Sequence, residues 1–112
     1  MTATSSVPVV IAGWIDYEPG ERQQVLKQFG EVARISRQEP GCLDYAVTPD
    51  LDDERRIRVF EHWESDAALW EHLTMPHVLE FRTATKAFHR LGRSLSKHLV
   101  ASSEPMQSSS ST

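Results

Sequence analysis

The chain has 112 residues, enough for one domain, and its 16 acidic residues outnumber its 12 basic ones to give a net charge of -4. No block of basic residues is apparent, which argues against a nucleic-acid partner, and no apolar run approaches the roughly 20 residues that cross a bilayer. The N-terminal residues also lack the basic and apolar parts of a secretory signal, so we expect a cytoplasmic protein with no membrane partner.

The first half of the chain predicts a strand followed by a long helix. Residues 1–6 have no pattern and are expected to be flexible. The range 7–17 carries apolar residues at alternate positions on both faces, which predicts a strand. The range 21–39 carries them at three- and four-residue spacing, which predicts an amphipathic helix. The sequence Glu-Pro-Gly at 39–41 ends that helix, because proline excludes its predecessor from the helical region.

Two short strands follow, over 42–48 and 57–63, joined by a polar turn. So short a connection favours antiparallel pairing. In the first of them, we expect Leu43 and Tyr45 to share one face. In the second, alternation places on one face Ile57, Val59, Glu61 and Trp63, and on the other Arg58, Phe60 and His62.

The last third of the chain predicts two helical pieces and a fourth strand. Ser65 is a suitable N-cap for a helix that ends at Leu73, and Pro76 begins a second helix that we expect to run to Leu91. Gly92 stops that helix, and the range 93–100 alternates as a strand. The serine-rich tail at 101–112 is expected to be disordered.

The resulting order, β-α-β-β-α-β with the last helix in two pieces, is typical of the ferredoxin-like α+β fold. It predicts a four-stranded antiparallel sheet with helices on one face, over residues 7–100. The other face would expose Val10, Trp14 and Phe60 to water. Because a second copy of the same sheet is the simplest cover for such a face, we expect a homodimer.

Three motifs carry a resemblance to a known family: EPGCLDY at 39–45, FEHWES at 60–65 and HLTMPH at 72–77. Together they resemble the antibiotic biosynthesis monooxygenase (ABM) family of dimeric α+β barrels, and within it the quinol monooxygenase branch. The resemblance makes 7–100 an ABM-like domain. It implies a cofactor-independent monooxygenase that oxidises a quinol, phenol or anthrone with dioxygen.

The same fold leaves other functions open, since fold alone does not fix function. The alternative is a non-catalytic dimer that binds a small molecule or acts as an accessory protein. Haem degradation is disfavoured. That branch of the superfamily resembles this chain in a tryptophan and a helix histidine, but it also has an asparagine in the first strand, and the range 9–17 contains none.

Oxygenation without a cofactor requires the protein to deprotonate the substrate and to hold the resulting anion near dioxygen in an apolar pocket. Histidine is a suitable base near neutral pH, so His72 is the expected catalytic base and Glu61 the residue that orients it. A structural role is as compatible with the sequence, in which His72 hydrogen-bonds Glu61 and ties helix to strand.

Four further residues are expected to bind the substrate. Aromatic side chains suit a flat ligand, and a histidine after the helix break could line the pocket mouth. These residues are Trp63, Phe81, Phe88 and His77. Each also fits a purely structural role: the aromatic residues as part of the core, and His77 as a solvated histidine at a helix end.

The sequence gives no sign of a metal or another cofactor. The single cysteine, Cys42, can form neither an internal disulfide nor a thiolate metal site. The five histidines include no H-x-x-x-H or H-x-x-E-H motif, and His72 and His77 are separated by a proline break. We therefore expect no metal and no cofactor.

Overall fold

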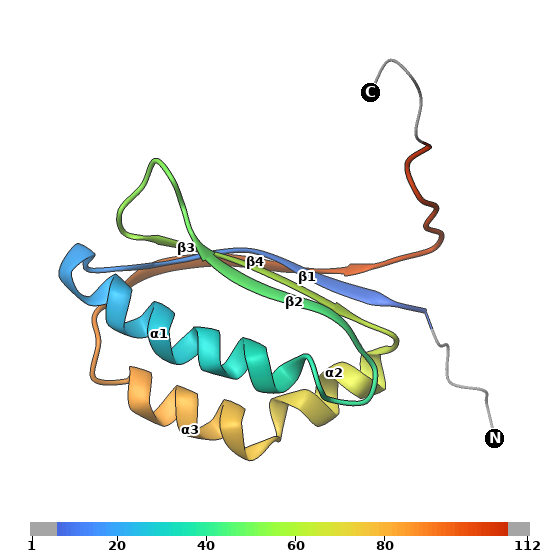
Figure 1. Cartoon of the computed structure of the whole chain (residues 1–112), viewed down its shortest axis with the longest axis horizontal. Coiled ribbons are helices and arrows are strands. Elements are labelled where there is room, and N and C mark those ends of the chain that lie inside the picture. The colour runs from blue at the N-terminus through green and yellow to red at the C-terminus, as the bar shows by residue number, and fades with distance from the viewer. Residues whose placement is uncertain (1–6, 108–112) are drawn as a thin grey trace.

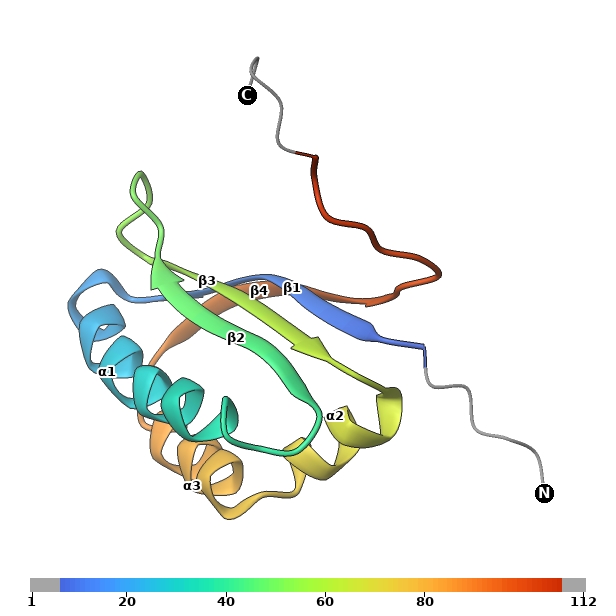
Figure 2. The same ribbon diagram turned by 45° about the vertical axis from the view of Figure 1, so that its right-hand side comes forward.

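The computed structural model describes residues 7–107 and consists of one sheet with all helices on one of its faces (Figures 1 and 2). The elements are β1 (Val9–Tyr17), α1 (Pro19–Ser36), β2 (Cys42–Pro49), β3 (Arg56–Trp63), α2 (Asp66–Leu73), α3 (Pro76–Thr85) and β4 (Arg90–Leu99). The strand order is β2-β3-β1-β4, and every neighbouring pair is antiparallel. The fold is the ferredoxin-like α+β fold expected from the sequence.

The ends of the chain are only partly described. Residues 101–107 contain no helix or strand. The expectations of a flexible segment at 1–6 and of a disordered tail at 108–112 lie outside the described residues. Within 7–107, none of the helices combines the length and the apolar character that crossing a membrane would require.

The core lies between the sheet and the helices, as the alternation of the strands predicts. Inward-facing residues of β1 and β3 stand opposite one another, with Val9 paired to Trp63 and Ile15 to Ile57. From α1, Val25, Phe29 and Val32 pack onto them at helical spacing. The fully buried side chains include Val9, Val25, Ile57, Trp63 and His72.

The boundary between the last helix and the last strand differs from the expectation. Helix α3 ends at Thr85 rather than Leu91, and β4 begins at Arg90 rather than Arg93. Gly92 lies inside the strand, opposite Asp16 of β1, and does not stop a helix. Strand pairing along the whole of β1 overrides the weak helical preference of the residues after Thr85.

A β-bulge changes the start of β2. Cys42 pairs with Trp63 and Asp44 pairs with His62, which leaves Leu43 without a partner on β3. The bulge interrupts the alternation, so Leu43 points to solvent with 55% of its surface exposed. The expectation that Leu43 shares the inner face with Tyr45 is therefore wrong, whereas Tyr45 itself is buried.

Gly13, in the middle of β1, allows β1 and β4 to approach closely. Its φ is +151°, and a Cβ atom at this position would lie 1.8 Å from the carbonyl oxygen of Ser94. The neighbours Ile11 and Ile15 both reach the space between sheet and helices. Glycine is therefore required where the central and edge strands meet.

Candidate active site

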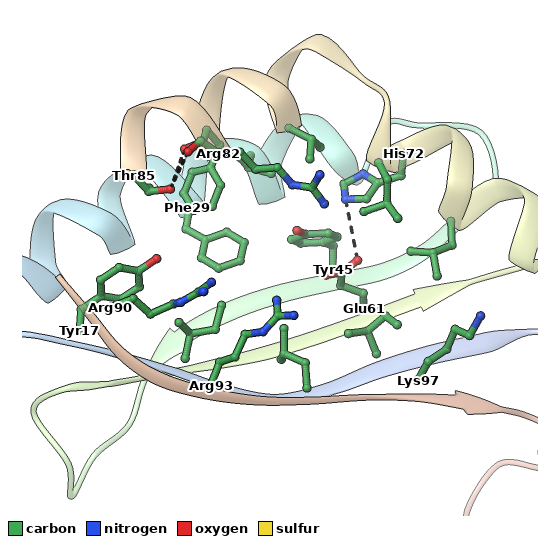
Figure 3. Close-up of a pocket in the computed structure, with 18 of the residues that line it drawn as sticks. Tyr17, Phe29, Tyr45, Glu61, His72, Arg82, Thr85, Arg90, Arg93 and Lys97 are labelled. Carbon is green, nitrogen blue, oxygen red and sulfur yellow. Dashed lines mark hydrogen bonds and ion pairs between the residues drawn. The ribbon is translucent and has the colours of Figure 1, made fainter. Parts of the chain in front are cut away.

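A cavity of about 700 Å³ lies between the sheet and the helices (Figure 3). Its apolar lining comes from every layer: Ile11, Ile15, Phe29, Val32, Leu69, Leu73, Val78, Phe81, Phe88 and Leu95. Among its polar lining groups are Tyr17, Tyr45, Glu61 and His72. Basic side chains from α3 and β4 also line it, and a cavity of this size with aromatic and polar lining groups suits a small molecule.

His72 is positioned by a short helix with well-defined ends. The Ser65 side chain accepts a hydrogen bond from the backbone nitrogen of Ala68 at 3.1 Å and caps α2. Spacing of three and four residues then places Ala68, Leu69 and His72 on the buried face of the helix. Below it, the alternation of β3 turns Glu61 inward, and the two side chains meet across the layers.

Both ring nitrogens of His72 face a carboxylate. Its Nδ1 lies 2.8 Å from Oε2 of Glu39. Its Nε2 lies 3.8 Å from Oε1 of Glu61, as Figure 3 shows. Because a carboxylate accepts hydrogen bonds, a neutral ring carries its proton on Nδ1 and donates it to Glu39. The lone pair on Nε2 then points towards Glu61 at the cavity, and only 2% of the residue is exposed.

Glu61 is a buried carboxyl group with one strong partner. The Nε1 of Trp63 donates a hydrogen bond to its Oε1 at 3.0 Å. Burial raises the pKa of Glu61, and the Trp63 hydrogen bond and the proximity of His72 offset part of that rise. Burial also raises the pKa of the neighbouring Tyr45, with the Glu61 charge adding to the effect. Glu61 therefore takes up a proton more readily than an exposed glutamate does.

Trp63 does not form a wall of the cavity, contrary to the expectation. It is completely buried and does not belong to the cavity lining. Its ring packs on that of His72, with centroids 4.6 Å apart, while its nitrogen is bound to Glu61. The physical reason is its place at the end of β3, opposite Val9 and Cys42, where α2 covers it. Trp63 supports the two polar residues instead.

His77 does not line the cavity mouth either. It lies in the first turn of α3 and faces the end of α1, where its Nε2 is 2.9 Å from Oε2 of Glu39 and 3.2 Å from Oγ of Ser36. Its side chain is 14% exposed. The structure therefore places His77 outside the cavity lining, because the helix break turns it towards α1.

Glu39 is the site residue that the sequence analysis missed. One of its carboxylate oxygens accepts from both His72 and His77, and the side chain is 8% exposed. The sequence shows Glu39 only as the last residue before a proline and a glycine. The signal for its role is indirect: a glutamate beside a Pro-Gly turn lies where the chain re-enters the sheet, close to the helices that cover it.

Glu39, His72 and His77 could also hold a metal ion, since their ligand atoms all lie within 4.8 Å of one another. Histidine spacing alone does not reveal this set, because its carboxylate comes from the segment between α1 and β2. The observed separations of 2.8 and 2.9 Å are those of hydrogen bonds. The absence of a metal remains a prediction, which chelation tests.

Phe81 and Phe88 do line the cavity, where the sequence analysis expected them. Phe81 packs on Phe29 with ring centroids 4.6 Å apart, and Phe29 contacts Tyr45 edge-on at 6.5 Å. These rings form an aromatic wall along one side of the space. Phe29 and Tyr45 belong to this wall although their sequence patterns indicate only core positions.

Comparison with known sequences gives one family. The family model for antibiotic biosynthesis monooxygenase matches residues 8–84. The probable quinol monooxygenase YgiN of Escherichia coli K12 is 35% identical over 78 residues, covering 61% of this chain and 75% of YgiN. The Synechocystis protein sll1783 is 32% identical over 66% of this chain. The chain spans about half the length of sll1783 (50%) and of the Bacillus subtilis protein YjcS (54%).

Solved structures show the same fold. PA3566 from Pseudomonas aeruginosa superposes with a TM-score of 0.78 at 25% identity, over 89% of this chain and 100% of that one. A candidate antibiotic biosynthesis monooxygenase from Deinococcus radiodurans gives a TM-score of 0.80 at 23% identity, over 89% and 99% of the two chains. The family match covers most of the described residues, and these similarities lead to one conclusion: the chain belongs to the antibiotic biosynthesis monooxygenase family.

Proposed function

We propose that the protein is a cofactor-independent monooxygenase that oxidises a hydroxylated aromatic compound, such as a quinol, phenol or anthrone, with dioxygen. The observation that carries this proposal is the buried His72, whose Nε2 faces an aromatic-walled cavity while its Nδ1 is fixed by Glu39. Family membership and the similarity to the probable quinol monooxygenase YgiN support it.

The proposed reaction begins with a proton transfer. A substrate hydroxyl at the polar end of the cavity gives its proton to Nε2 of His72, and the imidazolium that forms lies between the carboxylates of Glu39 and Glu61. Those two charges stabilise the protonated ring at the moment it forms. The substrate anion that remains is electron-rich enough to reduce dioxygen.

The oxygen chemistry then needs no other reactant. For a quinol, one atom of dioxygen replaces a ring hydrogen as a hydroxyl group, and the other leaves as water. The product is a hydroxyquinone, and the substrate supplies every electron that the dioxygen accepts. The protein contributes the base and rings such as Phe81 and Phe88 that hold the substrate plane.

Oxygen uptake tests the proposal directly. Protein treated with a chelator, and free of flavin and haem absorbance, is expected to consume oxygen above the spontaneous rate with at least one member of a panel of quinols and anthrones. Chelation is expected to leave the rate unchanged. Tight binding of a panel member without uptake would favour a binding or accessory role instead. Uptake that is lost on chelation and restored by a metal would assign Glu39, His72 and His77 to a working metal site.

We also propose that the protein is a homodimer, formed through the sheet face that no helix of the described chain covers (Figures 1 and 2). This face carries apolar side chains from β1 and β3, among them Val10, Trp14 and Phe60, and Phe60 is 37% exposed. An apolar sheet face in water is costly, and pairing with its own copy covers it.

The dimer proposal predicts that a single carboxylate introduced on the uncovered sheet face weakens association. Wild-type protein is expected to have the mass of a dimer in light scattering at micromolar concentration. Phe60→Asp is expected to weaken association at least about 100-fold, because it places a carboxylate in the apolar interface. Leu79→Asp is the matched control, because Leu79 is exposed on the helix layer at 48%. A monomeric wild-type protein, or equal effects of the two changes, would refute the arrangement.

A further inference from the structure

Positive charge is concentrated in one segment of the chain. Residues 81–97 contain five of the 12 basic residues and none of the 16 acidic ones, although the whole chain has a net charge of -4. All five line the cavity: Arg82, Lys86, Arg90, Arg93 and Lys97. The sequence shows no basic block, because successive charges are three or four positions apart, and only the fold places them all in the lining of one cavity.

Among the described residues, only one of these five charges has a carboxylate partner. Lys97 is paired with Asp66 at 2.8 Å. Within residues 7–107, by contrast, no carboxylate lies within ion-pairing distance of the four remaining side chains, Arg82, Lys86, Arg90 and Arg93. Several arginines outside the segment are paired: Arg34, Arg55, Arg56 and Arg58. Like charges that share one cavity repel one another, so an anion between them would be favourable.

The guanidinium groups point into the cavity. In Figure 3, Arg82 reaches down from the helix layer, and Arg90 and Arg93 reach up from the sheet. Arg90 lies beside Tyr17 at one end of the space, and His72 and Glu61 lie towards the other. Burial raises the pKa of Tyr17, and the charge of Arg90 offsets part of that rise.

We propose that the ligand of this cavity is a hydroxylated aromatic carboxylate, with its carboxylate at Arg90 and Arg93 and its hydroxyl at His72. The planar fork of arginine matches a carboxylate in two parallel hydrogen bonds. A cavity of about 700 Å³ has room for a compound of two or three rings. The proposal specifies the substrate class of the proposed monooxygenase and rests on that function only for the fate of the hydroxyl.

The basic residues of the cavity and the histidine–carboxylate group differ in their position relative to the range that the family model matches. The family match covers residues 8–84, so Lys86, Arg90 and Arg93 lie beyond it, whereas Glu39, Glu61 and His72 lie within it. Both arginines proposed to bind the carboxylate therefore lie outside the matched range, and the proposed proton-transfer residues lie inside it.

A matched pair of ligands tests the proposal by isothermal titration calorimetry without oxygen. The pair is 1,4-dihydroxy-2-naphthoate and 1,4-dihydroxynaphthalene, which share the ring and both hydroxyls and differ in the carboxylate. The carboxylate is expected to bind wild-type protein at least about tenfold more tightly, and rising salt is expected to reduce that preference. The Arg90→Gln, Arg93→Gln double variant is expected to remove most of the preference and to leave the affinity for the neutral diol within about twofold.

The controls separate this proposal from the proposed function. Arg58→Gln removes a paired arginine elsewhere on the sheet and is expected to preserve the preference. Equal affinities of wild-type protein for the two ligands, or an equal loss of both affinities in the double variant, would overturn the proposal.

The titration excludes oxygen, so it tests the ligand class separately from the monooxygenase function. A carboxylate that binds preferentially but is not oxidised when oxygen returns would refute the monooxygenase function and leave the ligand class supported. If the protein binds both ligands with equal affinity and oxidises both, the monooxygenase function would be supported and the proposed ligand class would be refuted.

Discussion

His72→Gln is expected to lower kcat/KM for the aromatic substrate by about 100- to 10,000-fold, the usual contribution of a general base. Glutamine can still donate to Glu39 through its amide and fills much of the same space, but it has no nitrogen that accepts a proton near neutral pH. The loss should therefore appear mainly in kcat, with substrate binding largely kept. Oxygen uptake under saturating substrate measures it.

A matched histidine gives the control. His89 lies just outside β4 with its side chain 77% exposed, and it contacts Glu21 rather than the cavity. His89→Gln is expected to keep wild-type turnover. Circular dichroism and the melting temperature of both variants establish that the fold is intact. Full turnover by a folded His72→Gln protein would show that another group removes the proton, and the structural role of His72 would then be the correct one.

Glu39→Ala is expected to lower the free energy of unfolding by about 2–5 kcal/mol, because it leaves ring nitrogens of His72 and His77 without their acceptor in a buried place. For a chain of this length the melting temperature should fall by about 10–20 °C. Urea denaturation followed by circular dichroism measures the change. Glu39→Gln keeps the volume and one accepting oxygen, and is expected to lose less than half as much.

Glu71 offers the comparison for this change. It precedes His72 on α2, is exposed, and has no ion pair within the described residues, so Glu71→Ala is expected to change stability by less than about 0.5 kcal/mol. A Glu39→Ala protein as stable as Glu71→Ala would mean that the two histidines find other partners. It would also remove Glu39 from the group of residues that fix the orientation of His72.

Local patterns predict most of the fold because strands, caps and breaks are encoded by neighbouring residues. The period-two pattern of β3 correctly separates Glu61 from His62, and Ser65 caps α2 as expected. The errors occur where distant residues decide the structure. Leu43 turns outward because a bulge shifts the register against β3, and Gly92 lies in a strand because Asp16 stands opposite it.

The same division holds for the site. His72 and Glu61 meet because one strand leads straight into one helix, a relation that the sequence spacing contains. Glu39 reaches His72 from 33 residues away, and no local pattern encodes that contact. The residue types of Trp63 and His77 suit substrate binding. Residue type alone, however, does not reveal whether a side chain faces the cavity or packs behind its lining.

The position of β4 at the edge of the sheet has a consequence for how this protein can change over evolutionary time. Glu61 lies on the interior strand β3, held by strands on both sides, whereas Arg90 and Arg93 lie on an outer strand that pairs only with β1. Substitutions on the outer strand disturb fewer neighbours and leave the histidine–carboxylate network untouched. The proposed carboxylate site can therefore change by substitution in the final segment without altering the contacts among Glu39, Glu61 and His72.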